Sequence, residues 1–240
     1  MNKTTRILIM SLLTISLFAV LPVFAGGKTE TSDQIGELEA GPSNTMKPKP
    51  AAAPRGWTGE SGATAVFAGG CFWGVEAVFE RLQGVNDVVS GYSGGDAETA
   101  KYQTVGTGTT GHAEAVYIDF NPDEISYETL LEVFFTVAHD PTQLGYQGPD
   151  VGSEYRSVIF YTDDAQRTAI ERSIEKIEQS GLYKDEVVTE IVPLDAFYPA
   201  EDYHQDFIKH NPNVPYVVYW DLPKLKHLEE AYPELITAAE

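Results

Sequence analysis

Short apolar runs with a period of two residues alternate with stretches of helical spacing from Thr64 onward. Residues 64–68 have the composition of a buried strand, and the apolar residues that follow recur at three- and four-residue intervals, at Val75, Val78, Phe79 and Leu82. Glu76, Glu80 and Arg81 lie off that apolar stripe. Two more helices are predicted over residues 126–138 and 163–179, and four more strands over residues 85–92, 112–120, 155–161 and 187–192.

The order strand, helix, strand, strand, helix, strand favours one α+β domain without internal repeats. We expect a two-layer α/β sandwich of ferredoxin-like character. The segment after Phe197 is richer in Tyr, Pro and His, and it is predicted to form a long C-terminal wrap over the domain that ends in a helix over residues 224–239.

The first 25 residues have the pattern of an export signal. Lys3 and Arg6 precede an apolar run over residues 7–23, and Ala25 places a small residue where a signal peptidase cuts. The alternative is an uncleaved anchor, because the apolar run is close to the length of a membrane span. We therefore expect an exported protein, periplasmic or extracellular, that is either released by cleavage or held at the membrane by residues 7–23.

Residues 26–57 are rich in Gly, Pro, Ala, Ser, Thr and Lys, and they contain few large apolar side chains. Such a segment cannot bury enough surface to order itself, so a flexible linker is predicted. This leaves residues 58–240 for the folded domain. The formal net charge of −20 argues against nucleic acid or an anionic membrane surface as a partner. With no apolar repeat to mark a subunit interface, a monomer is expected.

Cys71 is the only cysteine of the chain, and it follows Gly69 and Gly70 where a strand pattern gives way to a helical one. The N-terminus of a helix offers unpaired N–H groups and a partial positive charge, which favour a thiolate. Phe72 and Trp73 come next and suggest a small apolar pocket beside a nucleophile. A buried structural cysteine is the commoner role for a free thiol, but the surrounding glycines favour the reactive role.

Glu114 is the second candidate functional residue, because of the strand face on which it lies. Alternation along residues 112–120 places Glu114 on the same face as Val116, Ile118 and Phe120. A carboxyl group in apolar surroundings has a raised pKa and holds a proton near neutrality, which is the form that donates to an oxygen. The alternative is a glutamate at a frayed strand end that reaches solvent.

Three other patterns lack the context that ligand binding needs. Residues 106–111 fit GxGxxG, but a strand follows where dinucleotide binding requires a helix. Residues 119–123 have the first ligand spacings of a calcium loop without its central Gly or terminal Glu. The five histidines have no zinc spacing, and Glu201, Asp202 and His204 fit a polar helix start. No metal site is expected.

Five motifs occur in order along the folded domain. They read GCFWG at residues 70–74, GHAEAV at 111–116, HDPTQ at 139–143, YRS at 155–157 and FYPAEDYHQ at 197–205. Together they cover about residues 64–220 and closely resemble the A-type peptide methionine sulfoxide reductases, the MsrA family. The resemblance implies an enzyme that reduces the S epimer of methionine sulfoxide in oxidised proteins and peptides, and of free methionine sulfoxide, with residues 58–240 as its catalytic domain.

The resemblance also implies a role for each matching residue. Cys71 would attack the sulfoxide sulfur, while Glu114, assisted by Tyr102 and Tyr155, would protonate or hydrogen-bond to the departing oxygen. Asp150 would help to fix the polar network of the site.

The substrate's methyl group would lie against Phe72 and Trp73, since an aromatic wall favours an apolar group. Two departures from the family pattern lie beside the site, because Pro149 stands where the family has Asn and the usual Thr-Gln-Tyr reads Ser153-Glu154-Tyr155.

The reaction would leave a sulfenic acid on Cys71. Many family members resolve it with a second cysteine, which this chain lacks. We therefore expect a one-cysteine enzyme without a bound cofactor, in which an external thiol reductant (thioredoxin-like, glutaredoxin-like or a small thiol) attacks the sulfenic acid.

Two alternatives remain from the residues alone. One is a cysteine hydrolase or acyltransferase in which His112 or His204 activates Cys71. The other is a non-catalytic module that binds segments containing oxidised methionine.

Overall fold

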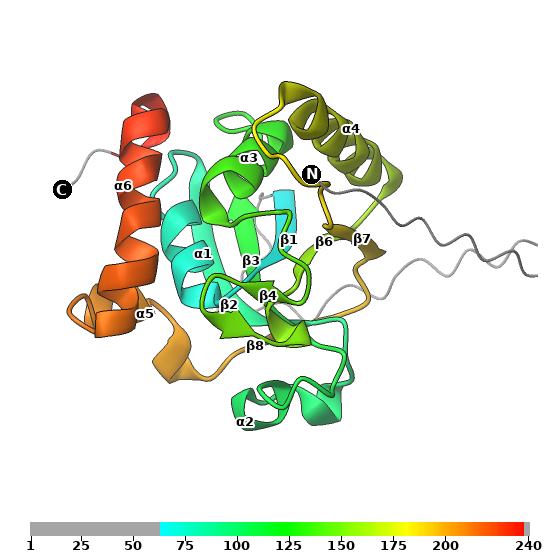
Figure 1. Cartoon of the computed structure of the whole chain (residues 1–240), viewed down its shortest axis with the longest axis vertical. Helices are drawn as coiled ribbons and strands as arrows, with labels where there is room; N and C mark the ends of the chain where they lie inside the picture. The colour runs from blue at the N-terminus through cyan, green and yellow to red at the C-terminus, as the bar shows by residue number, and fades with distance from the viewer. Residues whose placement is uncertain (1–62, 238–240) are drawn as a thin grey trace, which may run out of the picture. The chain divides into compact units, whose positions relative to one another are not determined.

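A six-stranded sheet organises residues 63–237, the part of the chain that this computed structural model describes (Figure 1). The strand order is β7-β6-β1-β3-β2-β8, and every neighbouring pair is antiparallel except β6 and β7. The strands are β1 (Ala63–Gly69), β2 (Val85–Ser93), β3 (Ala113–Phe120), β6 (Ser157–Tyr161), β7 (Glu190–Pro193) and β8 (Phe197–Pro199). The protein therefore has a mixed α/β fold built on one curled sheet.

Most of the core lies between one face of this sheet and the helices. These are α1 (Phe72–Phe79), α3 (Tyr127–Val133) with the π-helical turn η2 (Phe134–Ala138), α4 (Asp164–Ser180) and α6 (Leu222–Ala231). Phe67, Val116 and Ile118 point into this core, whereas Val66, Ala115 and Tyr117 belong to a smaller cluster that is separate from it. The two-residue alternation expected along β1 and β3 is confirmed.

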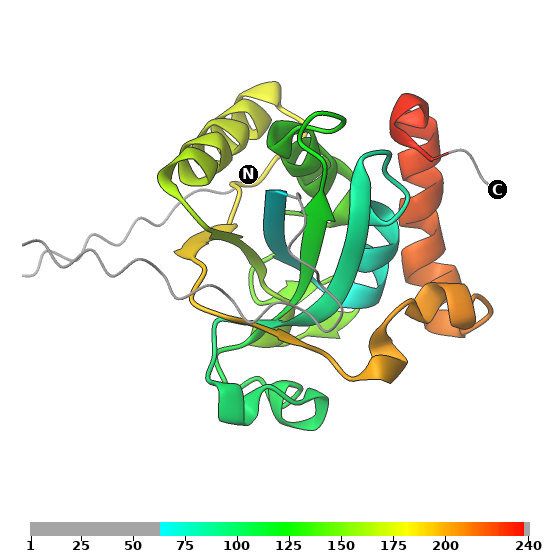
Figure 2. The ribbon, with the colours of Figure 1, turned by 180° about the vertical axis from the view of Figure 1, so that it is seen from behind.

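The C-terminal segment follows one edge of the sheet and returns over α1. β8 runs along β2 at the edge of the sheet (Figure 2). The side-chain amide of Gln205 bonds the backbone of Ser90 at 2.9 and 3.0 Å. The chain continues through the 3-10 turn η4 (Asp202–His204), α5 (Phe207–His210) and the π-helical turn η5 (Val217–Asp221) into α6.

Sequence periodicity missed the short elements. β8, the hairpin of β4 (Tyr146–Gln147) and β5 (Asp150–Val151), and the turns η1 (Ala97–Thr99), α2 (Tyr102–Val105), η3 (Ser153–Tyr155) and η6 (Pro233–Leu235) are too short to carry a repeat. β7 begins three residues later than predicted, at Glu190, and α6 ends at Ala231. Glu76 was expected off the apolar stripe of α1, yet it is only 1% exposed.

The predicted export signal or anchor (residues 1–25) and linker (residues 26–57) lie outside the described residues. Within residues 63–237, no helix is long and apolar enough to cross a membrane.

Candidate active site

Cys71 is held at a sharp turn between β1 and α1. Gly70 has φ of +92°, and a Cβ atom there would lie 2.5 Å from Cγ of Gln147. Glycine alone fits this position, since the backbone is left-handed and the space is filled. The turn makes Cys71 the N-cap residue of α1, where it is 8% exposed.

The surroundings of Cys71 keep its sulfur protonated. Burial raises the pKa of the thiol well above its usual value, and the nearby carboxyl groups of Glu114, Asp221 and Asp150 raise it further when they are ionised, while the backbone N–H of Trp73 lowers it. The free enzyme therefore carries a thiol, which differs from the thiolate expected from the helix N-terminus. Burial and the ionised carboxyl groups together outweigh the partial charge of one short helix.

Glu114 lies near the start of β3 and is buried, with only 3% of its surface exposed. The alternative of a glutamate that reaches solvent is therefore wrong. Its Oε2 accepts the backbone N–H of Phe72 at 3.1 Å, which places the carboxyl group against the first turn of α1. Burial raises the pKa of Glu114 to about 8, and the charges of Asp150 and Glu154 add to the effect although the N–H of Phe72 opposes it. Glu114 is therefore protonated near neutral pH and can donate to an oxygen.

Tyr102 and Tyr155 come from two short turns, and both lie near Cys71 and Glu114. Tyr102 begins α2, where its backbone N–H donates to Oε1 of Glu201 at 3.0 Å, and Tyr155 ends η3. Burial raises the pKa of both phenols, and Glu114 and Cys71 raise it further once they are ionised. Both hydroxyls thus stay neutral donors.

Asp150 in β5 accepts a short hydrogen bond from the hydroxyl of Tyr216. Burial raises the pKa of Asp150, while Tyr216 and the ammonium of Lys224 lower it. Tyr216 also belongs to the site, because its hydroxyl bonds Asp150 and its ring meets Trp73, and burial raises its pKa. Nothing in the sequence separated Tyr216 from the other tyrosines.

Trp73 forms the aromatic wall of the site, and three contacts fix its ring. Its Nε1–H donates to Nδ1 of His204 at 3.1 Å, its indole stacks on Phe207 with ring centroids 3.7 Å apart, and Tyr216 meets it edge-on at 5.9 Å. Phe72 is only 1% exposed and packs behind it in the core. Half-buried Trp73 is the part of this wall that a bound molecule can reach.

One ring nitrogen of each histidine proposed as a base for Cys71 is engaged elsewhere. Nδ1 of His204 accepts from Trp73, and Nε2 of His112 lies 3.0 Å from the carbonyl oxygen of Asp96. The other ring nitrogen of each is buried without a hydrogen-bond partner among the described residues, so neither histidine is hydrogen-bonded to Cys71 as the hydrolase alternative requires. Burial also lowers the pKa of His204.

Two buried carboxyl groups beside the site were not predicted as part of it. Asp221, at the end of η5, is 0% exposed, and neither of its oxygens has a hydrogen-bond partner among the described residues. It lies so close to the first turn of α1 that a Cβ on Gly74 would be 2.3 Å from its Oδ1. Glu154, the family departure, is 4% exposed, and its charge acts on Glu114.

Among residues 63–237, no group of three or more His, Cys, Asp or Glu side chains is placed to hold a metal ion. A buried thiol beside a protonated carboxyl group and three phenols is instead suited to accepting an oxygen atom.

Comparison with known proteins settles the family. The sequence model of a family described as peptide methionine sulfoxide reductase matches residues 63–235. The chain belongs to the peptide methionine sulfoxide reductase family. It is an enzyme that reduces methionine sulfoxide, and the binding-module and hydrolase alternatives are not favoured.

Relatives of this reductase cover most of its described domain. The peptide methionine sulfoxide reductase MsrA 2 of Mesorhizobium japonicum is 52% identical over 72% of this chain and 88% of its own length. The MsrA 2 of Synechocystis is 45% identical over 85% of this chain and 96% of its own. In structure, methionine sulfoxide reductase A of Corynebacterium diphtheriae is similar with a TM-score of 0.57 at 33% identity, covering 70% of this chain and 85% of that one.

Proposed function

We propose that the reductase transfers the sulfoxide oxygen of an oxidised methionine to Cys71. Glu114 donates a proton to the sulfoxide oxygen as the sulfur of Cys71 attacks, the S–O bond of the substrate breaks and an S–O bond to Cys71 forms. The proton of the thiol replaces the one that Glu114 gave. Cys71 is oxidised to a sulfenic acid by two electrons, and the substrate sulfur is reduced to methionine.

The hydrogen bond from the backbone N–H of Phe72 to Glu114 is the observation that carries this mechanism. It holds a protonated carboxyl group at the same helix end as the nucleophile. Tyr102 and Tyr155 are neutral donors for the same oxygen, and Asp150 with Tyr216 fixes the polar side. Trp73, backed by Phe72, receives the substrate's methyl group.

The second half of the cycle uses an external thiol, thioredoxin-like, glutaredoxin-like or small. The thiol attacks the sulfenic acid of Cys71, water leaves, and a second thiol exchange frees the enzyme. The attacking thiol must come from another molecule, because Cys71 is the only cysteine of the chain.

Three further expectations belong to this proposal. The central strand order β6-β1-β3-β2, with α1 and α3 on one face, supports a ferredoxin-like two-layer sandwich for the catalytic domain of residues 58–240. The N-terminal sequence pattern supports export by residues 1–25, with residues 26–57 as a linker. Finally, we propose a monomer.

The test is dithiothreitol-driven reduction of the two separated sulfoxide epimers of one methionine peptide. We expect turnover of the S epimer alone, abolished in Cys71→Ser. Equal turnover of both epimers, or activity that survives the substitution, would contradict the proposed mechanism.

A further inference from the structure

Exposed large apolar side chains gather on the three segments that border the site. Of the eight such residues within 63–237, all but Leu182 lie on the β4–β5 hairpin and the loop before it, in η4 or in η5. Each of these segments also supplies a site residue, namely Asp150, His204 or neighbouring Tyr216. The most exposed members are called the apolar rim below: Leu144 (72%), Val151 (79%), Tyr203 (61%), Tyr219 (74%) and Trp220 (47%).

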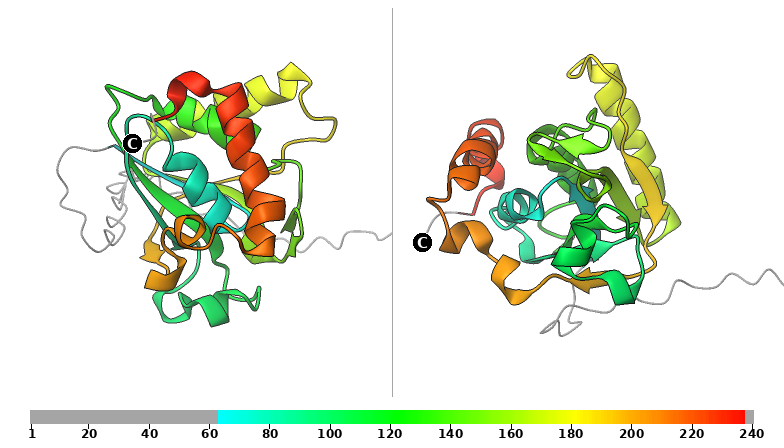
Figure 3. Two further views of the ribbon diagram at one scale, coloured as in Figure 1. Left: turned by 90° about the vertical axis from the view of Figure 1, so that its left-hand side faces the viewer. Right: turned by 60° about the horizontal axis from the view of Figure 1, so that its bottom comes forward.

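Contacts join the three segments that carry the apolar rim to one another and to Trp73. The Tyr216–Asp150 hydrogen bond joins the start of η5 to the hairpin, and a Cβ on Gly148 would be 3.6 Å from the indole of Trp220. Tyr203 lies against His204 with ring centroids 4.2 Å apart, and His204 is bonded to Trp73. Figure 3 shows the β4–β5 hairpin beside η5, the turn that continues into α6.

Apolar surface of this kind is costly on a soluble protein unless it binds something. Tyr and Trp are also the residue types that contribute most to binding at protein surfaces. The concentration at the site is informative, because Leu182 is the only exposed large apolar residue of 63–237 that lies elsewhere.

We propose that the apolar rim binds apolar residues on either side of the oxidised methionine in an extended polypeptide. This inference rests on the proposed function and narrows its substrate class to oxidised methionine that is flanked by apolar residues. Methionine belongs to the residues that are most often buried, and its neighbours in a core segment are apolar as well. A site bordered by apolar side chains therefore favours such segments over segments with polar flanks.

The experiment compares two peptides that differ only in their flanks, with Leu and Phe or with Ser and Gly around one S-epimer methionine sulfoxide. Dithiothreitol serves as the reductant, so that docking of a reductant protein plays no part. We expect kcat/KM to be about tenfold higher for the apolar peptide, the ratio that roughly 1.4 kcal/mol of binding gives. In the Leu144→Ser/Tyr219→Ser variant this ratio falls towards one.

The control is Leu182→Ser, which replaces the one exposed large apolar residue of 63–237 that lies outside the three segments (57% exposed), and it should leave the ratio unchanged. Equal kcat/KM for both peptides in the wild type would overturn the inference while leaving the reductase activity intact. So would a Leu144→Ser/Tyr219→Ser variant that keeps the ratio but raises KM for a thioredoxin-type reductant, since the apolar rim would then dock the reductant. Failure of the wild type to reduce either peptide would contradict the proposed function itself.

Discussion

At the scale of single residues, protonation defines this site. Glu114 has a pKa raised to about 8 by burial, so the acid form is present below that pH and is lost as the pH rises through it. We therefore expect kcat to fall above about pH 8. Glu114→Gln should lower kcat by roughly 10²–10⁴-fold, since an amide hydrogen-bonds but does not transfer a proton, and should remove the fall near pH 8. A pH–rate profile of both forms is the measurement, and an unchanged alkaline limb in the variant would exclude Glu114 as its source.

Asp221 is a second carboxyl group that affects this site, because its charge raises the pKa of the Cys71 thiol. The pKa of Asp221 is raised to about 6 by burial, with the ammonium of Lys224 opposing, so it is charged above that pH and disfavours the thiolate of Cys71. Asp221→Asn should therefore lower the pKa of Cys71 and accelerate its alkylation by iodoacetamide severalfold at pH 7–8. Glu76→Gln is the control, because Glu76 is a similarly buried carboxyl group on α1 that is not among the main causes of the raised pKa of Cys71. Equal alkylation rates in wild type and Asp221→Asn would refute this role.

At the scale of elements, α1 is positioned by what lies against its first turn. Gly74 allows η5 to approach so closely that a Cβ there would be 2.3 Å from Oδ1 of Asp221 and 3.1 Å from Nζ of Lys224. Gly74→Ala should destabilise the protein by about 1–3 kcal/mol through overpacking, although alanine favours the helix itself. Urea unfolding measures the loss, and adding Asp221→Ala should recover part of it. Additive effects of the two substitutions would show that they do not touch.

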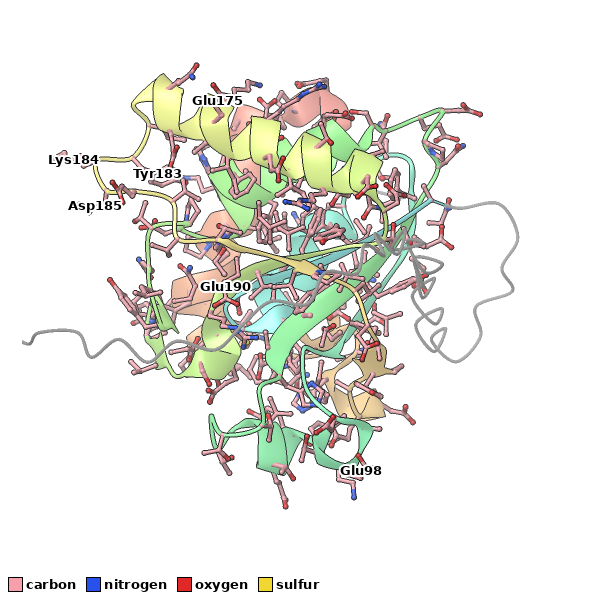
Figure 4. The ribbon with its side chains drawn as sticks, turned by 90° about the vertical axis from the view of Figure 1, so that its right-hand side faces the viewer. Glu98, Glu175, Tyr183, Lys184, Asp185 and Glu190 are labelled. Atoms are coloured by element: carbon pink, nitrogen blue, oxygen red, sulfur yellow. The ribbon has the colours of Figure 1, made fainter. Side chains whose placement is uncertain are left out.

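At the scale of the whole molecule, the chain of 240 residues contains a single cysteine, Cys71. Without thiol, the enzyme should therefore consume about one equivalent of sulfoxide substrate and stop with a gain of one oxygen in mass. Intact-mass spectrometry follows this directly, and several turnovers without thiol would contradict the one-cysteine cycle. Part of the excess negative charge of the protein lies outside the active site, since Glu175, Asp185 and Glu190 project around α4 and β7 (Figure 4).

Sequence alone determined the features that depend on local order: the strand and helix periods of β1, α1, β2, β3 and α4, the position of Cys71 at a helix start and the inward face of Glu114. Periodicity and turn chemistry are properties of neighbouring residues, so one chain suffices to read them. Only the tertiary structure joined Asp150 to Tyr216 and pressed Asp221 against Gly74. The thiol form of Cys71 also depends on the tertiary structure, because burial and the charges of residues distant in sequence raise its pKa and outweigh the adjacent helix turn.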